Sequence, residues 1–264
     1  MKWILCSLLF IFDLACTEKQ EVPAMAGVYT LRSQSVKSSS GDTTYNAIKL
    51  MKIYTGDHYM YAGIDPSGII AYYGIGTYTA GPGIVTERNI FNAAGAATDS
   101  SLQDSKLLIE KSEKGFTQKN TDASNQPQPV SITESYEAMS SSAVSALDGC
   151  WRENQFYAVK GNDTTYTPAA MQRTEYKVFY KGHFIFGITF KDNTKKNITI
   201  AGYGVFSGQE ENKIKQVITV SNNPRIVDPN GLTVAVEMDG PDEFRQITEE
   251  SDGTRYVSFF KRIK

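Results

Sequence analysis

Lys52-Ile-Tyr-Thr-Gly-Asp-His58-Tyr-Met-Tyr61, followed by Gly74-Ile-Gly76-Thr-Tyr78, is the stretch that decides the fold, because the chain repeats it. The repeat reads Lys177-Val-Phe-Tyr-Lys-Gly-His183-Phe-Ile-Phe186, followed by Gly202-Tyr-Gly204-Val-Phe206. The two histidines of the protein match each other at an offset of 125 residues, and the paired glycines match at 128. Self-similarity over such a period indicates a duplicated structural unit, with a loop that lengthened in the second copy.

Both copies have the alternation of β-strands rather than the spacing of helices. In the first copy Tyr59 and Tyr61 share one face of the strand while His58 and Met60 share the other, because side chains alternate across a strand. Paired glycines within strands are typical of a bend or of a close approach between backbones. The pair lacks the third glycine and the following helix of a nucleotide-binding loop. A strongly curved sheet is therefore expected.

The repeat extends beyond this stretch. Asp163-Thr-Thr-Tyr166 matches Asp42-Thr-Thr-Tyr45, and each unit offers about seven or eight short strands, which suits a small closed barrel. Segment 33–44 is rich in Ser, Gly and Asp and is expected to be a loop. The only segment compatible with a helix is 137–147, between the two units.

Length and composition limit the class of protein. The 264 residues include 41% hydrophobic and 11% aromatic side chains, which is ample for two small packed domains. The net charge is −2, and basic residues are interleaved with acidic ones instead of forming the basic face that nucleic-acid binding requires. Nucleic acid is therefore not an expected partner.

The amino terminus has the features of an export signal. Residues 1–15 contain Lys2 and then an apolar run of about ten residues, the length of a signal peptide's hydrophobic region and too short to span a bilayer. Asp13-Leu14-Ala15-Cys16 resembles the lipobox of bacterial lipoproteins, in which the cysteine is acylated. Cys16 is therefore the expected lipidation site, and 16–24 a flexible tether. Ala24-Met25-Ala26 also has the form of a cleavage site, but it lies far beyond the apolar run.

The opening and closing residues of the second unit suggest a family. Gly149-x-Trp151 begins its first strand, and Arg262 ends its last strand. This combination resembles the lipocalin and calycin superfamily, in which the arginine packs over the tryptophan and closes the barrel base, and the repeated stretch is similar to lipocalin-like proteins of Bacteroidota. The first unit has Gly27 and Tyr29 at the equivalent positions but no matching arginine.

The resemblance implies an all-β chain of two tandem lipocalin-like antiparallel up-and-down barrels, or partly open barrels, after the signal peptide and tether. The first unit is expected over 25–140, a linker over 141–146, and the second unit over 147–264. One shared sandwich or a single large barrel remains an alternative, because the weak closing strand of the first unit could pair across the boundary.

Ligand-binding candidates follow from strand alternation. Polar groups that converge into an aromatic pocket usually orient a small ligand, and a strand places Glu87 and Arg88 on opposite faces, so that one of them can point into the barrel. The candidates are Tyr59, Tyr61, Tyr78 and Glu87 in the first unit, and Phe184 and Phe186 in the second. Solid barrel cores are the alternative for both units, and the more favoured one for the phenylalanine-rich second unit.

Other reactive residues have simpler explanations. A zinc site needs three or four ligands, whereas each unit has one histidine, so neither metal nor cofactor is expected. Cys150 is expected to be a small buried hydrophobe. The two Asp-Thr-Thr sequences resemble the O-glycosylation pattern of exported Bacteroidota proteins, with Thr43 and Thr164 as acceptors in expected loops. No catalytic triad, paired carboxylates or phosphate loop is recognisable, so the sequence does not predict an enzyme.

The sequence therefore predicts an outer-membrane lipoprotein of the bacterial cell envelope that holds a small apolar or amphipathic molecule without covalent chemistry. The lipid anchor is its expected contact with the membrane. One alternative is an interaction module with solid barrels whose loops contact a protein or polysaccharide. Another is an isomerase or hydrolase with titratable groups inside one barrel. A measured cavity distinguishes the binding protein from the interaction module.

Overall fold

Antiparallel β-strands and one short 3-10 helix, η3 (Pro224–Ile226), make up the regular structure that the computed structural model describes. The described residues are 25–93, 95–96, 104–120, 130–142, 144–168, 171–210 and 212–264. Among them, no helix has the length and apolar character needed to cross a membrane. The expected signal peptide, the tether and Cys16 lie outside the described residues.

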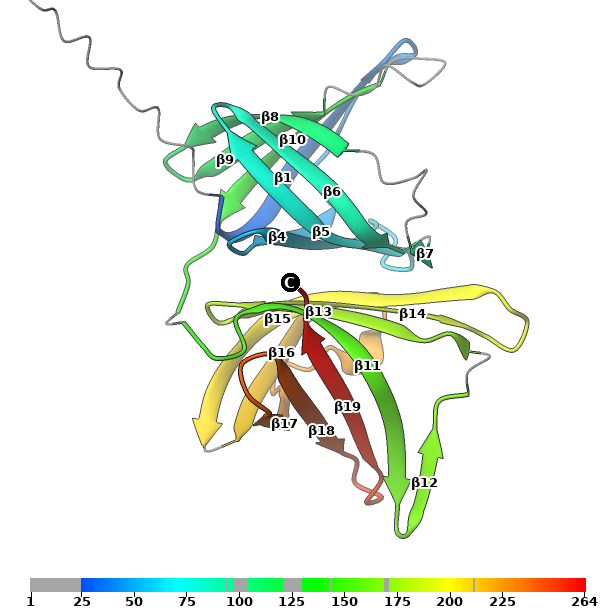
Figure 1. Ribbon diagram of the computed structural model, residues 1–264. Helices are drawn as coiled ribbons and strands as arrows, with labels where there is room; N and C mark the ends of the chain where they lie inside the picture. Colours follow the sequence, from blue (N-terminus) through cyan, green and yellow to red (C-terminus); the bar gives the residue numbers. More distant parts are fainter. Residues whose placement is uncertain are drawn as a thin grey trace, which may run out of the picture.

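Eight strands of the first unit form a closed antiparallel barrel in which neighbours in sequence are neighbours in the sheet (Figure 1). They are β1 (Gly27–Ser38), β3 (Lys49–Tyr54), β4 (His58–Ile64), β5 (Ala71–Gly81), β6 (Ile84–Asn92), β8 (Asp104–Ser112), β9 (Gly115–Asn120) and β10 (Ser131–Ala138). The barrel closes where β10 pairs with β1, from Tyr29 opposite Ala138 to Lys37 opposite Ser131. Two short strands extend the sheet, β2 (Gly41–Tyr45) beside β1 and β7 (Gly95–Ala96) beside β6.

The second unit repeats this topology. Its barrel strands are β11 (Gly149–Lys160), β13 (Thr174–Tyr180), β14 (His183–Lys191), β15 (Asn197–Glu210), β16 (Lys213–Ser221), β17 (Leu232–Met238), β18 (Glu243–Glu249) and β19 (Arg255–Arg262). β19 pairs with β11 to close the barrel, and β12 (Asp163–Tyr166) extends β11 as β2 extends β1. The predicted pair of tandem barrels is confirmed, and a shared sandwich or one large barrel is excluded.

Three local predictions were wrong. Segment 33–44 is mostly strand, because β1 and β2 form an exposed ribbon held by backbone pairing and by a Ser35–Thr44 hydroxyl contact of 3.1 Å. The Asp-Thr-Thr sequences likewise lie in exposed strands, β2 and β12, rather than in loops. No helix forms in the described part of 137–147, because its backbone bonds elsewhere; the Met139 amide, for example, donates to the Val28 carbonyl at 2.9 Å.

The repeated glycines allow backbones to approach closely, as predicted. A Cβ atom at Gly76 would lie 2.0 Å from the carbonyl oxygen of Arg88, and one at Gly204 would lie 1.9 Å from that of Val217. The strand register shifts at both glycines, as at a β-bulge. Bulges bend a strand and increase its twist, so the repeated pair marks where each barrel wall curves.

The outer walls of the two barrels pack against each other, with β4 and β5 facing β14 and β15 (Figure 1). Buried side chains from both units form one cluster there, the inter-barrel core, which includes Met60, Tyr73, Cys150 and Ile185. The Tyr73 hydroxyl is 3.0 Å from Thr189 Oγ1 across the boundary. Cys150 is 3% exposed, as expected for a buried hydrophobe.

Both histidines are buried on the outer-facing side of their strands. His58 Nδ1 is 2.7 Å from Asp57 Oδ1, and His183 Nε2 is 2.8 Å from the Ser140 carbonyl oxygen. The repeated segment therefore uses one face for contact between the barrels and leaves the other face for the barrel interior.

Candidate ligand-binding cavity

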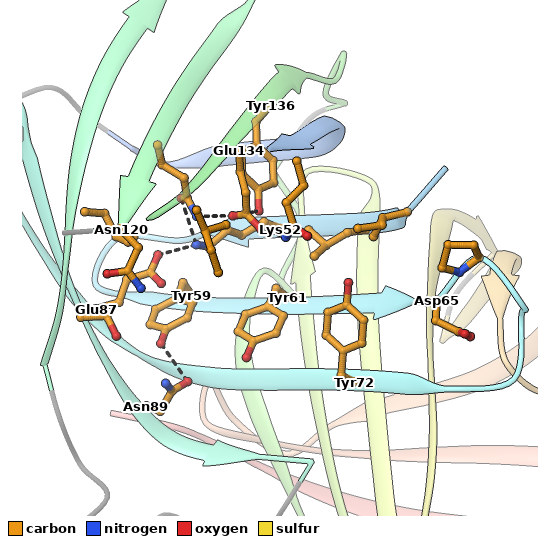
Figure 2. Close-up of a pocket in the computed structure, with 18 residues that line it drawn as sticks. Lys52, Tyr59, Tyr61, Asp65, Tyr72, Glu87, Asn89, Asn120, Glu134 and Tyr136 are labelled. Carbon is orange, nitrogen blue, oxygen red and sulfur yellow. Dashed lines mark hydrogen bonds and ion pairs between the residues drawn. The ribbon is translucent and has the colours of Figure 1, made fainter. Parts of the chain in front are cut away.

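A cavity of about 510 Å³ lies inside the first barrel (Figure 2). All eight barrel strands contribute side chains to it, so it is the barrel interior and not a surface groove. The lining residues are Gln34, Ile48, Leu50, Lys52, Tyr59, Tyr61, Asp65, Pro66, Tyr72, Glu87, Asn89, Ser105, Leu107, Gln118, Asn120, Ile132, Glu134 and Tyr136. Small-molecule sites in proteins typically occupy about 300–1,000 Å³.

Glycines on the neighbouring strand make room for two of the tyrosine rings. Tyr61 on β4 lies opposite Gly74 on β5, and Tyr72 on β5 lies opposite Gly63 on β4. A Cβ atom at Gly74 would lie 2.7 Å from the Tyr61 ring, and one at Gly63 would lie 2.3 Å from the Tyr72 ring. Each ring therefore lies across the backbone of the opposite glycine, which a side chain at that position would prevent.

A buried ion pair lies at one side of the cavity. Lys52 Nζ is 2.6 Å from Glu87 Oε1, and these residues are only 3% and 6% exposed. Glu87 also accepts a hydrogen bond from the Tyr54 hydroxyl, and Lys52 donates to Gln118 Oε1 at 3.3 Å. The ammonium lies 5.1 and 5.4 Å from the ring centres of Tyr54 and Tyr59. Pairing, hydrogen bonds and cation–π contacts together offset the cost of burying these charges.

Glu134 on β10 lies on another side of the cavity and is held by neutral donors (Figure 2). Its carboxylate accepts hydrogen bonds from Gln34 Nε2 at 2.7 Å, Gln118 Nε2 at 2.5 Å and the Tyr136 hydroxyl at 3.0 Å. Gln118 therefore links this carboxylate to Lys52 in one polar network. Among the described residues, no cationic side chain forms an ion pair with Glu134.

The hydroxyl groups of Tyr61 and Tyr72 have no hydrogen-bond partner in the described part of the chain, although both residues line the cavity. Burial, and then the charge of Glu87, raises the pKa of Tyr61 to about 12. Burial, and then the charge of Glu134, raises the pKa of Tyr72 to about 12. Both phenols are therefore neutral near pH 7 and can donate a hydrogen bond to a bound molecule.

The structure brings together only some of the predicted ligand-binding residues. Tyr59, Tyr61 and Glu87 line the cavity, whereas Tyr78 donates to the Thr55 carbonyl oxygen at 2.8 Å and packs on Tyr54. Phe184 and Phe186 lie in the packed aromatic core of the second barrel, away from the cavity. For Phe184 and Phe186 in the second barrel, as for Tyr78 in the first, the geometry favours packing over contact with a ligand.

Three important cavity residues were not predicted from the sequence: Lys52, Tyr72 and Glu134. A signal for Lys52 existed, since alternation points it inward with Tyr54 and the repeat places Lys177 at the same position. Tyr72 and Glu134 belong to the site only through the pairing of β5 with β4 and of β10 with β1.

The base of the second barrel is closed by Arg262, whose guanidinium lies 4.1 Å from the ring centre of Trp151. Arg262 Nη1 donates to the Asp148 carbonyl oxygen at 2.7 Å, and Nε donates to that of Pro241 at 2.9 Å. Gly149 has a φ of 138°, and a Cβ atom there would lie 2.0 Å from Arg262 Nη1. The glycine thus provides both the backbone conformation and the space that the arginine needs.

Charged side chains in the second barrel pair with one another. Arg173 pairs with Glu153, at 2.9 Å, and with Glu175, which is also 3.1 Å from Lys177 Nζ. Burial, and then the negative charge of Glu175, raises the pKa of Glu153 to about 7. Burial opposes ionisation of Glu175 too, but Lys177 and Arg173 lower its pKa below the usual value.

Comparisons with known proteins found only solved structures of low identity to this chain. No family model matches the chain, and no curated protein matches it. A crystal structure of a lipocalin-like protein from Bacteroides uniformis aligns at 18% identity over 45% of this chain and 100% of its own, with a TM-score of 0.29. One of an uncharacterized protein from Bacteroides eggerthii aligns at 16% identity over 44% of this chain and 99% of its own, with a TM-score of 0.27.

The strand topology of the chain itself defines the class. Eight antiparallel strands in sequence order, closed by the first and the last, form the up-and-down barrel of lipocalins, and this chain has two such lipocalin-like barrels in tandem. A closed barrel of eight strands has an interior just wide enough to be filled by side chains or to hold one small ligand. Within the described residues, no group of three or more His, Cys, Asp or Glu side chains is placed to hold a metal ion.

Proposed function

We propose that the first barrel binds one small amphipathic molecule without covalent chemistry, and that the second barrel is mainly structural. The observation that carries this proposal is the cavity of about 510 Å³, which lies within the size range of small-ligand sites. The corresponding wall of the second barrel instead contributes Phe184 and Phe186 to a packed core.

The lining favours an amphipathic ligand over a wholly apolar one. Leu50, Leu107 and Ile132 provide apolar surface, and the tyrosine rings extend it. The same walls carry the Tyr61 and Tyr72 hydroxyls and the Glu134 carboxylate. Filling the cavity with hydrocarbon alone would remove water from these polar groups without replacing its hydrogen bonds, which costs about 1–3 kcal/mol for each group left unsatisfied.

The arrangement of the charged groups supports binding rather than catalysis. Lys52 and Glu87 neutralise each other, and Tyr54 donates to the same carboxylate. The Tyr61 phenol, with a pKa raised to about 12 by burial and then by Glu87, is a hydrogen-bond donor and not a base near pH 7. The paired charges and the neutral Tyr61 phenol are therefore better suited to binding a ligand than to transferring protons.

A pair of tryptophan substitutions on β8 tests the proposal. Leu107 lines the cavity and is 5% exposed, whereas its neighbour Leu108 faces outward and is 44% exposed. With n-octanol as the probe in titration calorimetry, Leu107→Trp is expected to weaken binding at least about tenfold by filling the cavity, while Leu108→Trp leaves it unchanged. Equal affinities for the wild type and Leu107→Trp, or failure of both n-octanol and n-octylammonium to bind to the wild type, would contradict the proposal.

We also propose that the protein is held at the cell envelope by a lipid on Cys16. The support is the sequence alone: an apolar run of signal-peptide length ends shortly before this cysteine. Membrane fractionation of Cys16→Ala is expected to move the protein out of the membrane fraction, whereas Cys6→Ala, within the expected signal peptide, leaves it there. Unchanged membrane retention of Cys16→Ala would refute the anchor.

A further inference from the structure

We infer that the molecule bound in the first barrel carries a positively charged head group, such as an amine or ammonium, beside Glu134. This inference rests on the proposed function and adds the chemical class of the ligand. Four of the lining residues are charged, one positively and three negatively: Lys52, Asp65, Glu87 and Glu134. The cavity therefore has a formal charge of −2, which favours a cation over an anion.

Lys52 is not available as the anchor of an anionic ligand such as a fatty acid. Lys52 is 3% exposed, and its ammonium lies 2.6 Å from Glu87 and donates to Gln118. It is also enclosed by the rings of Tyr54, Tyr59 and Tyr136, at 5.1 to 6.0 Å. An incoming carboxylate would have to displace Glu87 and leave that residue as a buried charge without a counter-ion, which is strongly unfavourable.

The charge of Glu134 has no such compensation within the described chain. Its three partners are an amide of Gln34, an amide of Gln118 and the phenol of Tyr136, and all three are neutral donors. These donors hold its position without cancelling its charge. A cation entering the cavity would therefore gain a charge-assisted contact without breaking an existing ion pair.

The aromatic wall beside Glu134 suits a cation as well. The rings of Tyr59 and Tyr61 are stacked, with centroids 6.4 Å apart and an interplanar angle of 11°, and Tyr72 follows at 6.5 Å from Tyr61. One end of this wall already holds an ammonium group, that of Lys52 over Tyr59. Tyr61 and Tyr72 continue the same type of surface towards Asp65 (Figure 2), where a ligand cation can face their rings.

The second barrel, as an internal duplicate, lacks these features. Ser258 lies opposite Phe156 on the closing strand pair, as Glu134 lies opposite Gln34. Phe184 and Phe186 replace Tyr59 and Tyr61 in the repeat. The carboxylate without a counter-ion and the tyrosine wall therefore occur together in the barrel that has the 510 Å³ cavity.

Three probes of equal chain length test the inference: n-octylammonium, n-octanol and n-octanoate, each titrated calorimetrically into the purified protein at neutral pH and low salt. We expect octylammonium to bind at least about tenfold more tightly than octanoate, with a preference that shrinks as salt is added. Glu134→Gln should reduce the preference at least about threefold. The matched control is Glu137→Gln, on the same strand but paired outside the barrel with Arg32.

The outcomes separate this inference from the proposed function. If octanol and octylammonium both fail to bind, the proposed function fails, and the inference fails with it. If octanol binds but octanoate binds at least as tightly as octylammonium, the binding site stands and the cationic ligand class is wrong. The same conclusion follows if a folded Glu134→Gln keeps the full preference. The wild-type comparison decides the matter even if that variant does not fold.

Discussion

Lys52→Met is expected to be among the most destabilising single substitutions in the first barrel. It removes the ammonium 2.6 Å from Glu87 and leaves the carboxylate of this residue, which is 6% exposed as a whole, with the Tyr54 hydroxyl and no counter-ion. Breaking a buried ion pair by removing one partner costs about 3–5 kcal/mol, because the remaining charge stays desolvated. Lys52→Met combined with Glu87→Gln should recover at least about 1–2 kcal/mol of that loss, since no buried charge is then left alone.

Urea denaturation followed by circular dichroism measures this effect. With a denaturant dependence of about 1–3 kcal/mol per molar urea, the midpoint of Lys52→Met should fall by at least about 1 M. Lys49→Met, an exposed position on the same strand, should shift the midpoint by less than about 0.3 M. A Lys52→Met midpoint within about 0.3 M of the wild type, or a double variant less stable than the single one, would refute the ion-pair reasoning.

Three further predictions concern the inter-barrel core and the second barrel. Ile185→Ala, at a fully buried position between the barrels, should cost about 2–5 kcal/mol of unfolding free energy. Val205→Ala, 38% exposed on the neighbouring strand, should cost less than about 0.5 kcal/mol. Equal losses in urea denaturation would be inconsistent with a shared core. Arg262→Lys should lose about 1–2 kcal/mol of unfolding free energy and change the fluorescence of Trp151. The reason is that a lysine cannot stack as a plane on the ring while it donates to both backbone carbonyls. An unchanged spectrum and an unchanged urea midpoint would count against the role of Arg262 in closing the barrel. Burial, and then the charge of Glu175, raises the pKa of Glu153 to about 7 in the folded state, so the folded protein keeps a proton that the unfolded chain releases above about pH 4.5. The free energy of unfolding should therefore fall as the pH rises from about 4.5 to about 7, and Glu153→Gln should flatten this fall. Parallel pH profiles for the wild type and the variant would contradict this prediction.

The fold was largely predictable because it depends on short-range patterns that occur twice. Alternation along the strand separated Tyr59 and Tyr61 from His58 and Met60, and the structure puts the first pair in the barrel and Met60 in the inter-barrel core. In the segments that were misassigned, no pattern of buried side chains identifies a strand. Exposed polar ribbons such as β1–β2 have the composition of loops, and only backbone pairing shows that they are strands.

The candidate site was predicted only in part, since its membership depends on register. Tyr78 is an aromatic residue that was expected to face inward, yet its hydroxyl donates to the Thr55 carbonyl oxygen outside the cavity. Tyr72 enters the cavity because Gly63 lies opposite it. That contact depends on how β4 pairs with β5 and cannot be predicted from either strand alone. Glu134 reaches the same space from β10, the strand that closes the barrel.

The sequence by itself determined that the protein is a duplicated all-β chain, where its barrel walls curve, and which faces of the repeated strands differ. Those properties are local, because side-chain alternation and the missing Cβ atoms of glycines act within a few residues. Only the tertiary structure decided that one barrel holds a cavity while its duplicate contributes phenylalanines to a packed core, and that Glu134 faces this cavity without a counter-ion. Cavity volume and charge balance depend on side chains from all eight strands meeting in one space, which is fixed only when the barrel closes.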